Sequence, residues 1–365
     1  MRSARVALIV VFVCLTGICQ AQSHFTQLDH WMEDHAKELG GRAILLVSKD
    51  GMLVYSKDIN ELSRRQKMVN KFAARRMGGK ADTEDYTATT RQPVASCSKW
   101  LSTALVMTFV DEGKLSLSDT VGKYLPVLSQ HGKGMITIGQ CLSHLTGILE
   151  PPLKESLQLF KDLSGMDEAM EKIAALPMEG EPGKTFHYSN AGLQIAGAVL
   201  EKISGEGFQT LFAERIAGPL EMQNTDFGKG RVALPAGGAG STPEDYMNFL
   251  TMIRQKGLFK DRRVLSEKSI SEMQVNRISP DTKIAYSPAG MEGIGYGYGE
   301  WIVIDPVTKQ PTGTVTSPGL FGSVPWVDNQ RGYSAFLMTF FIKKGAGEQN
   351  FKNLKQQVDA AIDAK

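Results

Sequence analysis

The sequence predicts an α+β protein in which one antiparallel sheet, built from both ends of the chain, is flanked by helices and carries a helical insertion. Two observations lead to this prediction. Strand-like stretches separated by turn residues occur near both termini, over residues 43–56 and 296–342. Between them, over residues 97–230, the apolar residues recur at helical spacing and Gly and Pro separate the segments.

Residues 1–21 have the composition of a secretory signal peptide. Arg2 and Arg5 precede the almost wholly apolar run 6–18, and a small residue, Ala21, offers a cleavage site. The apolar run is well short of the roughly 20 residues that a membrane-spanning helix needs, which argues against a membrane anchor. A lipoprotein is a weaker alternative, because Cys19 follows a bulky residue. We therefore expect an exported protein, periplasmic or secreted, without stable membrane insertion after cleavage.

The charge balance and the cysteine content exclude several classes of function. Cleavage removes two of the 41 basic residues and none of the 39 acidic residues, so the mature chain carries no net charge. Nothing in this balance indicates a nucleic acid or an anionic membrane as partner. No C-x-x-C pair and no His/Cys cluster at zinc spacing occurs, so we expect neither a metal nor another cofactor. Cys97 and Cys141 remain, either as a disulfide or as two free buried thiols.

The first predicted elements are a helix and a hairpin. The helix covers residues 25–39, with its apolar residues near one face and two glycines at its end. Two short apolar runs, 43–48 and 52–56, then flank the pair Asp50-Gly51. An Asp-Gly pair between such runs is typical of a β-hairpin.

Residues 61–80 form a basic segment in which Glu61 is the one opposing charge. The simpler interpretation is a solvated helical excursion with Met68, Phe72 and Met77 pointing inward. The alternative is a basic lip beside an active site. The basic residues of this segment are Arg64, Arg65, Lys67, Lys71, Arg75, Arg76 and Lys80.

Three amphipathic helices are predicted in the middle of the chain. The first covers residues 100–112 and ends at Gly113, and the second covers residues 191–203 and ends before Gly205. The third covers residues 242–256, with Thr242 as its N-cap and a proline at its first position.

The C-terminal part of the chain returns to strand-like patterns. Residues 296–304, 313–321 and 332–342 are the predicted strands, and residues 351–362 form a closing helix. These elements divide the mature chain into a discontinuous α/β domain and a mostly helical domain. The α/β domain covers residues 22–95 and 235–365, and the helical domain covers residues 96–234.

The strongest chemical motif is a Ser-x-x-Lys pattern at Ser96 and Lys99, at the start of a predicted helix. Neither a Gly-x-Ser-x-Gly elbow nor a His-Glu-x-x-His motif occurs in the chain. Residues three apart share a helix face, so Lys99 can reach the hydroxyl of Ser96. A serine needs a base to become a nucleophile, and a lysine serves as one if burial or nearby positive charge lowers its pKa from about 10.4. The alternative without a catalytic role is an N-cap serine followed by a surface lysine.

A second constellation lies at Tyr188 and Asn190, on a loop before the predicted helix 191–203. A tyrosine can relay protons, and an asparagine can bind a substrate amide while it orients Lys99. A second Tyr-x-Asn pair, Tyr246 and Asn248, lies inside a predicted amphipathic helix, where the tyrosine is expected to pack. We therefore assign no function to that pair.

Together these residues resemble the serine β-lactamase and penicillin-binding-protein superfamily, and most closely class C β-lactamases and the related family VIII esterases. In these proteins Ser-x-x-Lys is followed by Tyr-x-Asn, and the segments 142–148, 188–203 and 237–249 are similar to further family segments in the same order. The resemblance covers most of the mature chain. It implies a β-lactamase/transpeptidase-like fold in which Ser96, Lys99 and Tyr188 are catalytic, Asn190 binds substrate and His144 is structural.

The third motif of that family is a Lys or His, a Thr or Ser, and a Gly on a strand that lines the site. The best match here is Ser317-Pro318-Gly319, in which Ser317 stands where the cation is expected. The resemblance places Ser317, Gly319 and Leu320 in substrate binding, with the Leu320 N–H and the Ser96 N–H as oxyanion hole, because Pro318 has no N–H. Trp326 and Asp328 are expected either on the same rim or in a hairpin turn.

The sequence thus predicts a serine hydrolase that forms an acyl-enzyme at Ser96, with Lys99 and Tyr188 sharing the proton and Tyr188 as the base for deacylation. The expected substrate is a small-molecule carboxylic ester or uncharged amide, because the cation that would hold a substrate carboxylate is absent. A β-lactamase or a D-Ala-type peptidase acting on peptides is the alternative within the class. The alternative from another class is a non-catalytic cell-wall-binding protein on the same fold.

Overall fold

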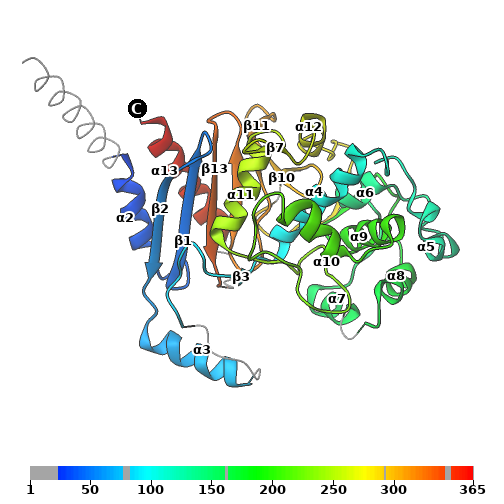
Figure 1. Ribbon diagram of the computed structural model, residues 1–365, viewed down its shortest axis with the longest axis horizontal. Coiled ribbons are helices and arrows are strands. Elements are labelled where there is room, and N and C mark those ends of the chain that lie inside the picture. The colour runs from blue at the N-terminus through cyan, green and yellow to red at the C-terminus, as the bar shows by residue number, and fades with distance from the viewer. Residues whose placement is uncertain (1–23, 77–82, 161–162, 292, 342–346, 365) are drawn as a thin grey trace, which may run out of the picture.

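The computed structural model describes residues 24–76, 83–160, 163–291, 293–341 and 347–364. The predicted signal peptide, residues 1–21, and Met77 lie outside the described residues. Within those ranges, no helix combines the length and the apolar character that crossing a membrane requires. The whole-chain architecture is a central sheet with helices on both faces (Figure 1).

The central sheet has seven strands in the order β2-β1-β13-β12-β11-β10-β9, and every neighbouring pair is antiparallel. Both ends of the chain contribute to it, because β1 pairs with β2 on one side and with β13 on the other. The predicted antiparallel sheet is therefore confirmed. Its strands are β1 (Arg42–Lys49), β2 (Met52–Asn60), β9 (Gly295–Tyr296), β10 (Trp301–Ile304), β11 (Pro311–Thr316), β12 (Val324–Asp328) and β13 (Tyr333–Thr339).

The predicted hairpin is the β1–β2 pair, and the turn chemistry explains it. Asp50 and Gly51 both have positive φ angles, 53° and 80°. These angles match the type I′ turn, whose twist suits two adjacent antiparallel strands. β2 is the edge strand, and its first residues, Met52 and Leu53, are exposed.

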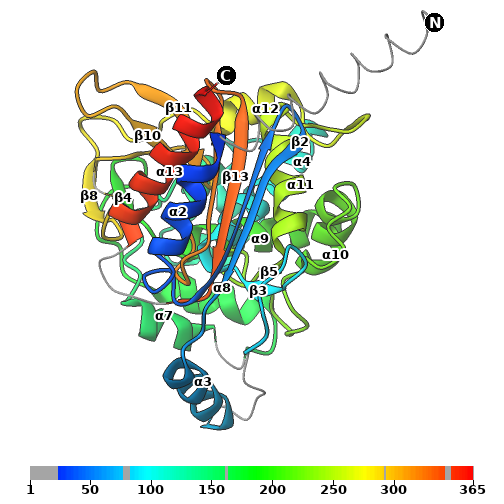
Figure 2. The ribbon, with the colours of Figure 1, turned by 90° about the vertical axis from the view of Figure 1, so that its left-hand side faces the viewer.

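The outer face of the sheet is covered by α2 (Thr26–Asp34) and α13 (Gly347–Asp363), which lie side by side (Figure 2). Trp326 on β12 is fully buried under this layer and donates a hydrogen bond to the hydroxyl of Tyr333 at 2.9 Å. The expectation that Trp326 lies on the rim of a site or in a turn is therefore wrong. Asp328, the last residue of β12, does have a role in a hairpin turn, because its carboxylate accepts hydrogen bonds from the N–H groups of the turn residues Gln330 and Arg331.

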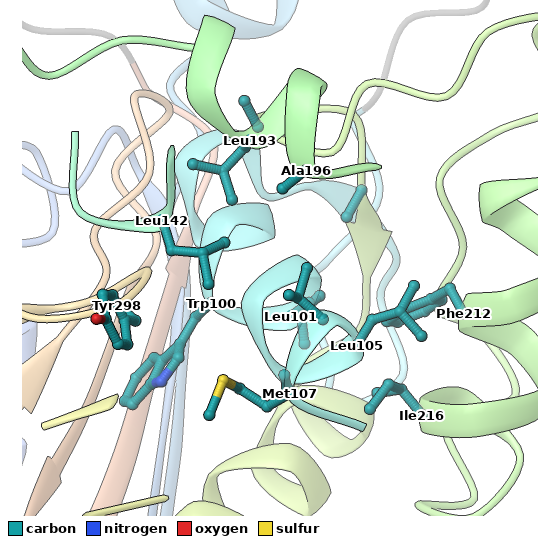
Figure 3. Close-up of a cluster of buried hydrophobic side chains, with 14 of the residues drawn as sticks. Trp100, Leu101, Leu105, Met107, Leu142, Leu193, Ala196, Phe212, Ile216 and Tyr298 are labelled. Carbon is teal, nitrogen blue, oxygen red and sulfur yellow. The ribbon is translucent and has the colours of Figure 1, made fainter. Parts of the chain in front are cut away.

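The inner face of the sheet is covered by α11 (Pro243–Arg254), and α4 (Ser98–Asp111) packs against α11 through the edge-to-face contact between Trp100 and Phe249 (Figure 1). The predicted start of α11 is confirmed, because the Thr242 hydroxyl accepts a hydrogen bond from the Asp245 N–H and Pro243 is the first residue of the helix. The amphipathic character expected for α4 is wrong: residues 98–109 are all buried. Helices from the insertion pack around α4 on the sides that the sheet leaves open, as its neighbours Leu142, Leu193 and Phe212 show (Figure 3).

The inserted region is mostly helical, and its elements form the part of the molecule that lies beyond the central sheet (Figure 1). Its second predicted helix, α9 (Ala191–Ser204), is confirmed and ends at Gly205 in the left-handed conformation, with φ 77°. Its other helices are α5 (Pro126–Gln130), α6 (Ile138–Leu142), α7 (Leu153–Leu159), α8 (Met166–Ala175), α10 (Phe208–Phe212), the short 3₁₀ helix η2 (Val121–Lys123) and the π-helix η3 (Ala213–Ala217). Outside the inserted region lie the 3₁₀ helix η1 (Ala95–Cys97), at its start, and α12 (Glu267–Met273). The short strands are β3 (Gln92–Pro93), β4 (Thr185–His187), β5 (Gly240–Ser241), β6 (Leu258–Phe259), β7 (Arg262–Arg263) and β8 (Lys283–Tyr286).

The basic segment contains the helix α3 (Arg64–Arg76), which projects from the body beyond the end of β2 (Figures 1 and 2). The helical excursion is thus confirmed, but its expected packing is wrong for two residues. Met68 and Phe72 are 66% and 69% exposed, so these two side chains do not point inward.

The predicted strand 313–321 ends five residues early. After Thr316 the chain forms a loop in which the Gly319 N–H donates to the Ser323 carbonyl at 2.8 Å and the Gly322 N–H donates to the Gly319 carbonyl. Pro318 lacks the N–H that a sheet ladder needs, and Gly322 has a φ of 95°, which favours glycine. This loop connects β11 to β12 and lies next to the residues described below.

Candidate active site

Ser96 lies in η1, immediately before α4, and the residue that precedes it is strained. Ala95 has a φ of 47°, a left-handed conformation that non-glycine residues seldom adopt. Its neighbours hold it there, since the Val94 N–H donates to the Ala239 carbonyl and the Cys97 N–H donates to the Val94 carbonyl. Such strain is retained where the surrounding structure over-determines the backbone, which is common at active sites.

Lys99 lies one helical turn further on and reaches Ser96 as the spacing predicts. Its Nζ atom is 3.2 Å from Ser96 Oγ, 3.2 Å from Asn190 Oδ1 and 2.8 Å from the Ala236 carbonyl oxygen. The Lys99 side chain is only 1% exposed, and Cys97 rather than Ser96 is the N-cap of α4. The alternative of an N-cap serine with a surface lysine is therefore wrong.

The environment of Lys99 makes its amine easier to deprotonate than that of an exposed lysine. Burial lowers the pKa of Lys99 to about 8, although the nearby Glu150 carboxylate acts in the opposite direction. A neutral amine has two N–H groups and one lone pair. If the two N–H groups bond to Asn190 Oδ1 and the Ala236 carbonyl, the lone pair remains for the hydroxyl of Ser96. The contacts of Lys99 thus match those of a base that accepts the serine proton.

Tyr188 follows β4 and forms, with Ser96 and Lys99, a group of three polar side chains. Its hydroxyl interacts with Ser96, and its ring lies 4.8 Å from the Lys99 Nζ atom and stacks on Trp301 at 5.2 Å. Burial raises the pKa of the Tyr188 phenol, which keeps it protonated at neutral pH. Tyr188 can therefore pass a proton on, but it does not store a negative charge in the resting protein.

Asn190 is the N-cap residue of α9, and a carboxylate that sequence reasoning missed holds it in place. Glu150 is 6% exposed and accepts hydrogen bonds from the Asn190 side-chain amide at 2.8 Å and from the Ala191 N–H at 2.8 Å. It also accepts from the Asn190 N–H and from the Ser156 hydroxyl. The available signal was an isolated Glu in the otherwise apolar segment 147–153.

The residues assigned to the third motif, Ser317, Gly319 and Leu320, lie in different surroundings. Ser317 is 1% exposed, and its hydroxyl lies 3.1 Å from the Gly299 carbonyl oxygen and 3.3 Å from that of Ser96. The Ser317 side chain thus packs against the backbone of Ser96 and Gly299 instead of facing the cavity. Gly319 is tightly packed, because a Cβ atom there would lie 2.3 Å from the Val94 carbonyl oxygen. Leu320 is 49% exposed, and no described residue accepts a hydrogen bond from its backbone N–H.

Ser96, Lys99, Tyr188, Asn190, Gly319 and Leu320 all line one cavity of about 1220 Å³. No described residue of α3 lines it, so these residues do not form the basic lip that was the alternative for the segment 61–80. Most of the remaining wall is apolar. It includes Leu149, Pro151, Phe160, Tyr286, Met291, Ile294, Trp301 and Phe321.

The other candidate polar residues have structural positions. His144 is buried, with its Nε2 atom 3.0 Å from the Tyr296 hydroxyl and its Nδ1 atom accepting from the Ser189 N–H. Tyr246 is buried in α11 and donates to the Cys97 carbonyl at 2.8 Å, which confirms that it packs. Cys97 and Cys141 are both free and buried. Among the described residues, no group of three or more His, Cys, Asp or Glu could hold a metal ion.

Comparisons with known proteins identify the family and the fold of this chain. The family model described as "Beta-lactamase" matches residues 29–340. Protein Rv1367c of Mycobacterium tuberculosis is 26% identical over 291 residues, which cover 63% of this chain and 72% of that protein.

Two solved structures share the fold over nearly the whole chain. A structure described as a "putative beta-lactamase" from Bacteroides dorei has a TM-score of 0.74 at 26% identity and covers 93% of this chain and 98% of its own. EstCE1, "a hydrolase with promiscuous acyltransferase activity", has a TM-score of 0.73 at 20% identity and covers 93% and 99%. The β-lactamase/transpeptidase-like fold predicted from the motifs is thus confirmed. The roles of the individual site residues and the predicted domain boundaries stay predictions.

Proposed function

The chain belongs to the beta-lactamase family, whose members include hydrolases, and we propose that it is a serine hydrolase that forms an acyl-enzyme at Ser96 and releases the acyl group to water. The observation that carries this proposal is the 3.2 Å contact between Lys99 Nζ and Ser96 Oγ, with Lys99 removed from solvent.

Acylation begins with proton transfer from Ser96 to Lys99. The Ser96 oxygen forms a bond to the carbonyl carbon of an ester or amide, and its proton moves to the neutral amine of Lys99. The tetrahedral intermediate then collapses, the bond to the leaving group breaks, and the leaving group takes a proton. Tyr188 contacts Ser96 and lies over Lys99, so it is placed to pass that proton from Lys99 to the leaving group.

Deacylation reverses these proton transfers with water as the nucleophile. The sequence predicts Tyr188 as the base for this step. Because burial raises the pKa of its phenol, we propose that Tyr188 relays the proton of the attacking water to Lys99 and does not hold it. Lys99, with a pKa of about 8, is then the group that changes charge in both half-reactions.

The oxyanion of each intermediate needs backbone donors in a desolvated place. The Leu320 N–H faces no acceptor among the described residues, and the tight packing of Gly319 on Val94 keeps this loop next to the nucleophile. The Ser96 N–H lies in the first turn before α4, where N–H groups lack intrahelical partners. We propose that these two N–H groups form the oxyanion hole.

The cavity favours an uncharged, largely apolar substrate. Its wall is mostly apolar, and Ser317 provides no cation for a substrate carboxylate. A carboxylic ester or uncharged amide fits these walls better than a penicillin-like or peptide-terminal carboxylate. EstCE1, with a similar fold, is itself described as a hydrolase with acyltransferase activity, which supports an acyl-enzyme. We further propose that the protein is exported, on the composition of residues 1–21.

Intact-mass measurement after incubation with p-nitrophenyl esters and with a β-lactam tests the proposal. The wild type is expected to gain one acyl group and to release p-nitrophenol, and the Ser96→Ala variant is expected to do neither. Ser129→Ala is a matched control, because Ser129 lies on α5, away from the cavity wall. Labelling of a residue other than Ser96 would disprove the mechanism. The absence of an adduct with every acyl donor would instead favour a binding protein.

A further inference from the structure

Glu150 is a buried carboxylate that lies at the candidate active site but takes no part in the proton transfers proposed above. It lies in the segment after α6, far in sequence from both α4 and α9, and its side chain is 6% exposed. A buried charge is costly unless it is paired and hydrogen-bonded, so its position needs a physical reason.

The hydrogen bonds of Glu150 use both of its oxygens. Oε1 accepts from the Ser156 hydroxyl and from the Asn190 side-chain amide, and Oε2 accepts from the N–H groups of Asn190 and Ala191. An ionised carboxylate offers about four acceptor positions, so these four donors fill them. Glu150 therefore has no lone pair left to take a proton from water, although it lines the cavity.

The same contacts orient Asn190 in one direction. The Asn190 amide nitrogen donates to Glu150 Oε1 at 2.8 Å and to Ser156 Oγ at 3.2 Å. Its carbonyl oxygen must then face the other way, where it lies 3.2 Å from Lys99 Nζ. A rotated amide would leave its carbonyl oxygen against the Glu150 carboxylate, which is repulsive, and would remove the acceptor that Asn190 offers to an N–H group of Lys99.

We propose that Glu150 is the positioning residue of this site: it locks the Asn190 amide, which lies between its carboxylate and the Lys99 amine, so that Lys99 is held against Ser96. This inference rests on the proposed role of Ser96 and Lys99. The other titratable groups near Lys99 are His144 at the end of α6, Tyr188 after β4 and Cys97 beside α4. Glu150 differs from these three groups because it is a carboxylate, and its charge stabilises the protonated amine of Lys99.

Removal of the Glu150 charge is expected to have two effects that change the acylation rate in opposite directions. Loss of the Asn190 orientation lowers the rate, whereas easier deprotonation of Lys99 raises it at low pH, so the proposal is testable. Glu150→Gln presents an NH₂ group to donors that need acceptors, so Asn190 loses its orientation. We expect acylation by a p-nitrophenyl ester to slow by about 10- to 100-fold. Loss of the negative charge also makes the protonated amine of Lys99 less stable. The pH at which acylation reaches half of its maximum is therefore expected to move to lower pH.

Stopped-flow acylation rates between pH 5 and pH 10 measure both effects, with circular dichroism and thermal unfolding as checks of the fold. Glu150→Asp keeps the charge and is expected to return the pH midpoint toward that of the wild type. Ser156→Ala keeps the carboxylate and is expected to slow acylation by a smaller factor without moving the midpoint. Glu168→Gln is the control, because Glu168 also accepts hydrogen bonds from a backbone N–H and a serine hydroxyl, but on the surface at α8.

Three outcomes overturn the inference while the proposed function stands. The first is an acylation rate and pH midpoint in Glu150→Gln that equal those of the wild type. The second is a slower rate with an unmoved midpoint in both Glu150 variants, which would mean a purely structural role. The third is normal acylation followed by accumulation of the acyl-enzyme, which would make Glu150 a base for deacylation. If the wild type itself forms no Ser96 adduct, the proposed function fails instead.

Discussion

The Nζ atom of Lys99 lies 3.2 Å from the Oγ atom of Ser96, across the junction between η1 and α4, with the lysine almost fully removed from solvent. One turn of helix brings the two side chains together, but the depth at which they meet decides their chemistry. An exposed lysine at this spacing would stay protonated at neutral pH.

Lys99→Met is expected to lower the acylation rate of Ser96 by about 10²- to 10⁴-fold, because it removes the proposed general base and keeps most of the length of the side chain. The rate of p-nitrophenol release in the first turnover measures this effect. Lys114→Met is the control, since Lys114 is an exposed lysine paired with Glu112. A Lys99→Met rate within a few-fold of the wild type would exclude Lys99 as the base.

The pH dependence of acylation follows from the direction of the Lys99 shift. Burial lowers the pKa of Lys99 to about 8, and only the neutral amine accepts a proton. The acylation rate is therefore expected to rise with pH, to reach half of its maximum near pH 8, and to level off above it. Rates corrected for spontaneous ester hydrolysis provide the measurement. A rate that falls as the pH rises from 6 to 9 would contradict this assignment.

Gly319→Ala is expected to lower kcat/KM by about tenfold or more. The new Cβ atom would lie 2.3 Å from the Val94 carbonyl oxygen, so either the loop after β11 or the segment before Ser96 must move. Both carry proposed oxyanion donors, and small displacements of such donors are costly. Gly207→Ala is the matched control, because nothing lies within 4 Å of a Cβ atom at that position. Equal kinetics in both variants would show that the loop is not part of the site.

Glu300→Gln is expected to stabilise the fold, increasingly so as the pH rises. Glu300 is fully buried, and neither of its carboxyl oxygens has a hydrogen-bond partner among the described residues. Burial raises the pKa of Glu300 well above its usual value, so the folded protein binds a proton that the unfolded chain has released. The Glu300 carboxyl therefore contributes fully to the free energy of unfolding of the wild type below the unfolded pKa of about 4.5. This contribution is lost as the pH rises toward the folded pKa.

Urea unfolding at pH 5, 6, 7 and 8 checks the Glu300 prediction. The difference in the free energy of unfolding between Glu300→Gln and the wild type should grow by up to about 1.4 kcal/mol per pH unit. Glu206→Gln, at an exposed position, serves as the control. A difference that is constant over this range would mean that Glu300 is ionised in the folded protein.

Features that depend on a few neighbouring residues could be read from the sequence. The Asp50-Gly51 turn, the N-cap at Thr242 and the Gly205 helix end each follow from local backbone chemistry. The Ser96 and Lys99 pair belongs to the same group, because its spacing is that of one helical turn.

Tertiary structure decided which side chains are buried and which of them face the cavity. α4 is covered on all sides by the sheet and by later helices, so its polar residues are buried, and the β12 residue Trp326 lies under α13. Ser317 turns toward backbone carbonyls, and Glu150 meets Asn190 across 40 residues of sequence. Hydrogen bonds between distant segments and the loss of solvent around Lys99 exist only after the chain has packed. The proposed nucleophile was therefore readable in the sequence, whereas the electrostatic environment around it was set by the fold.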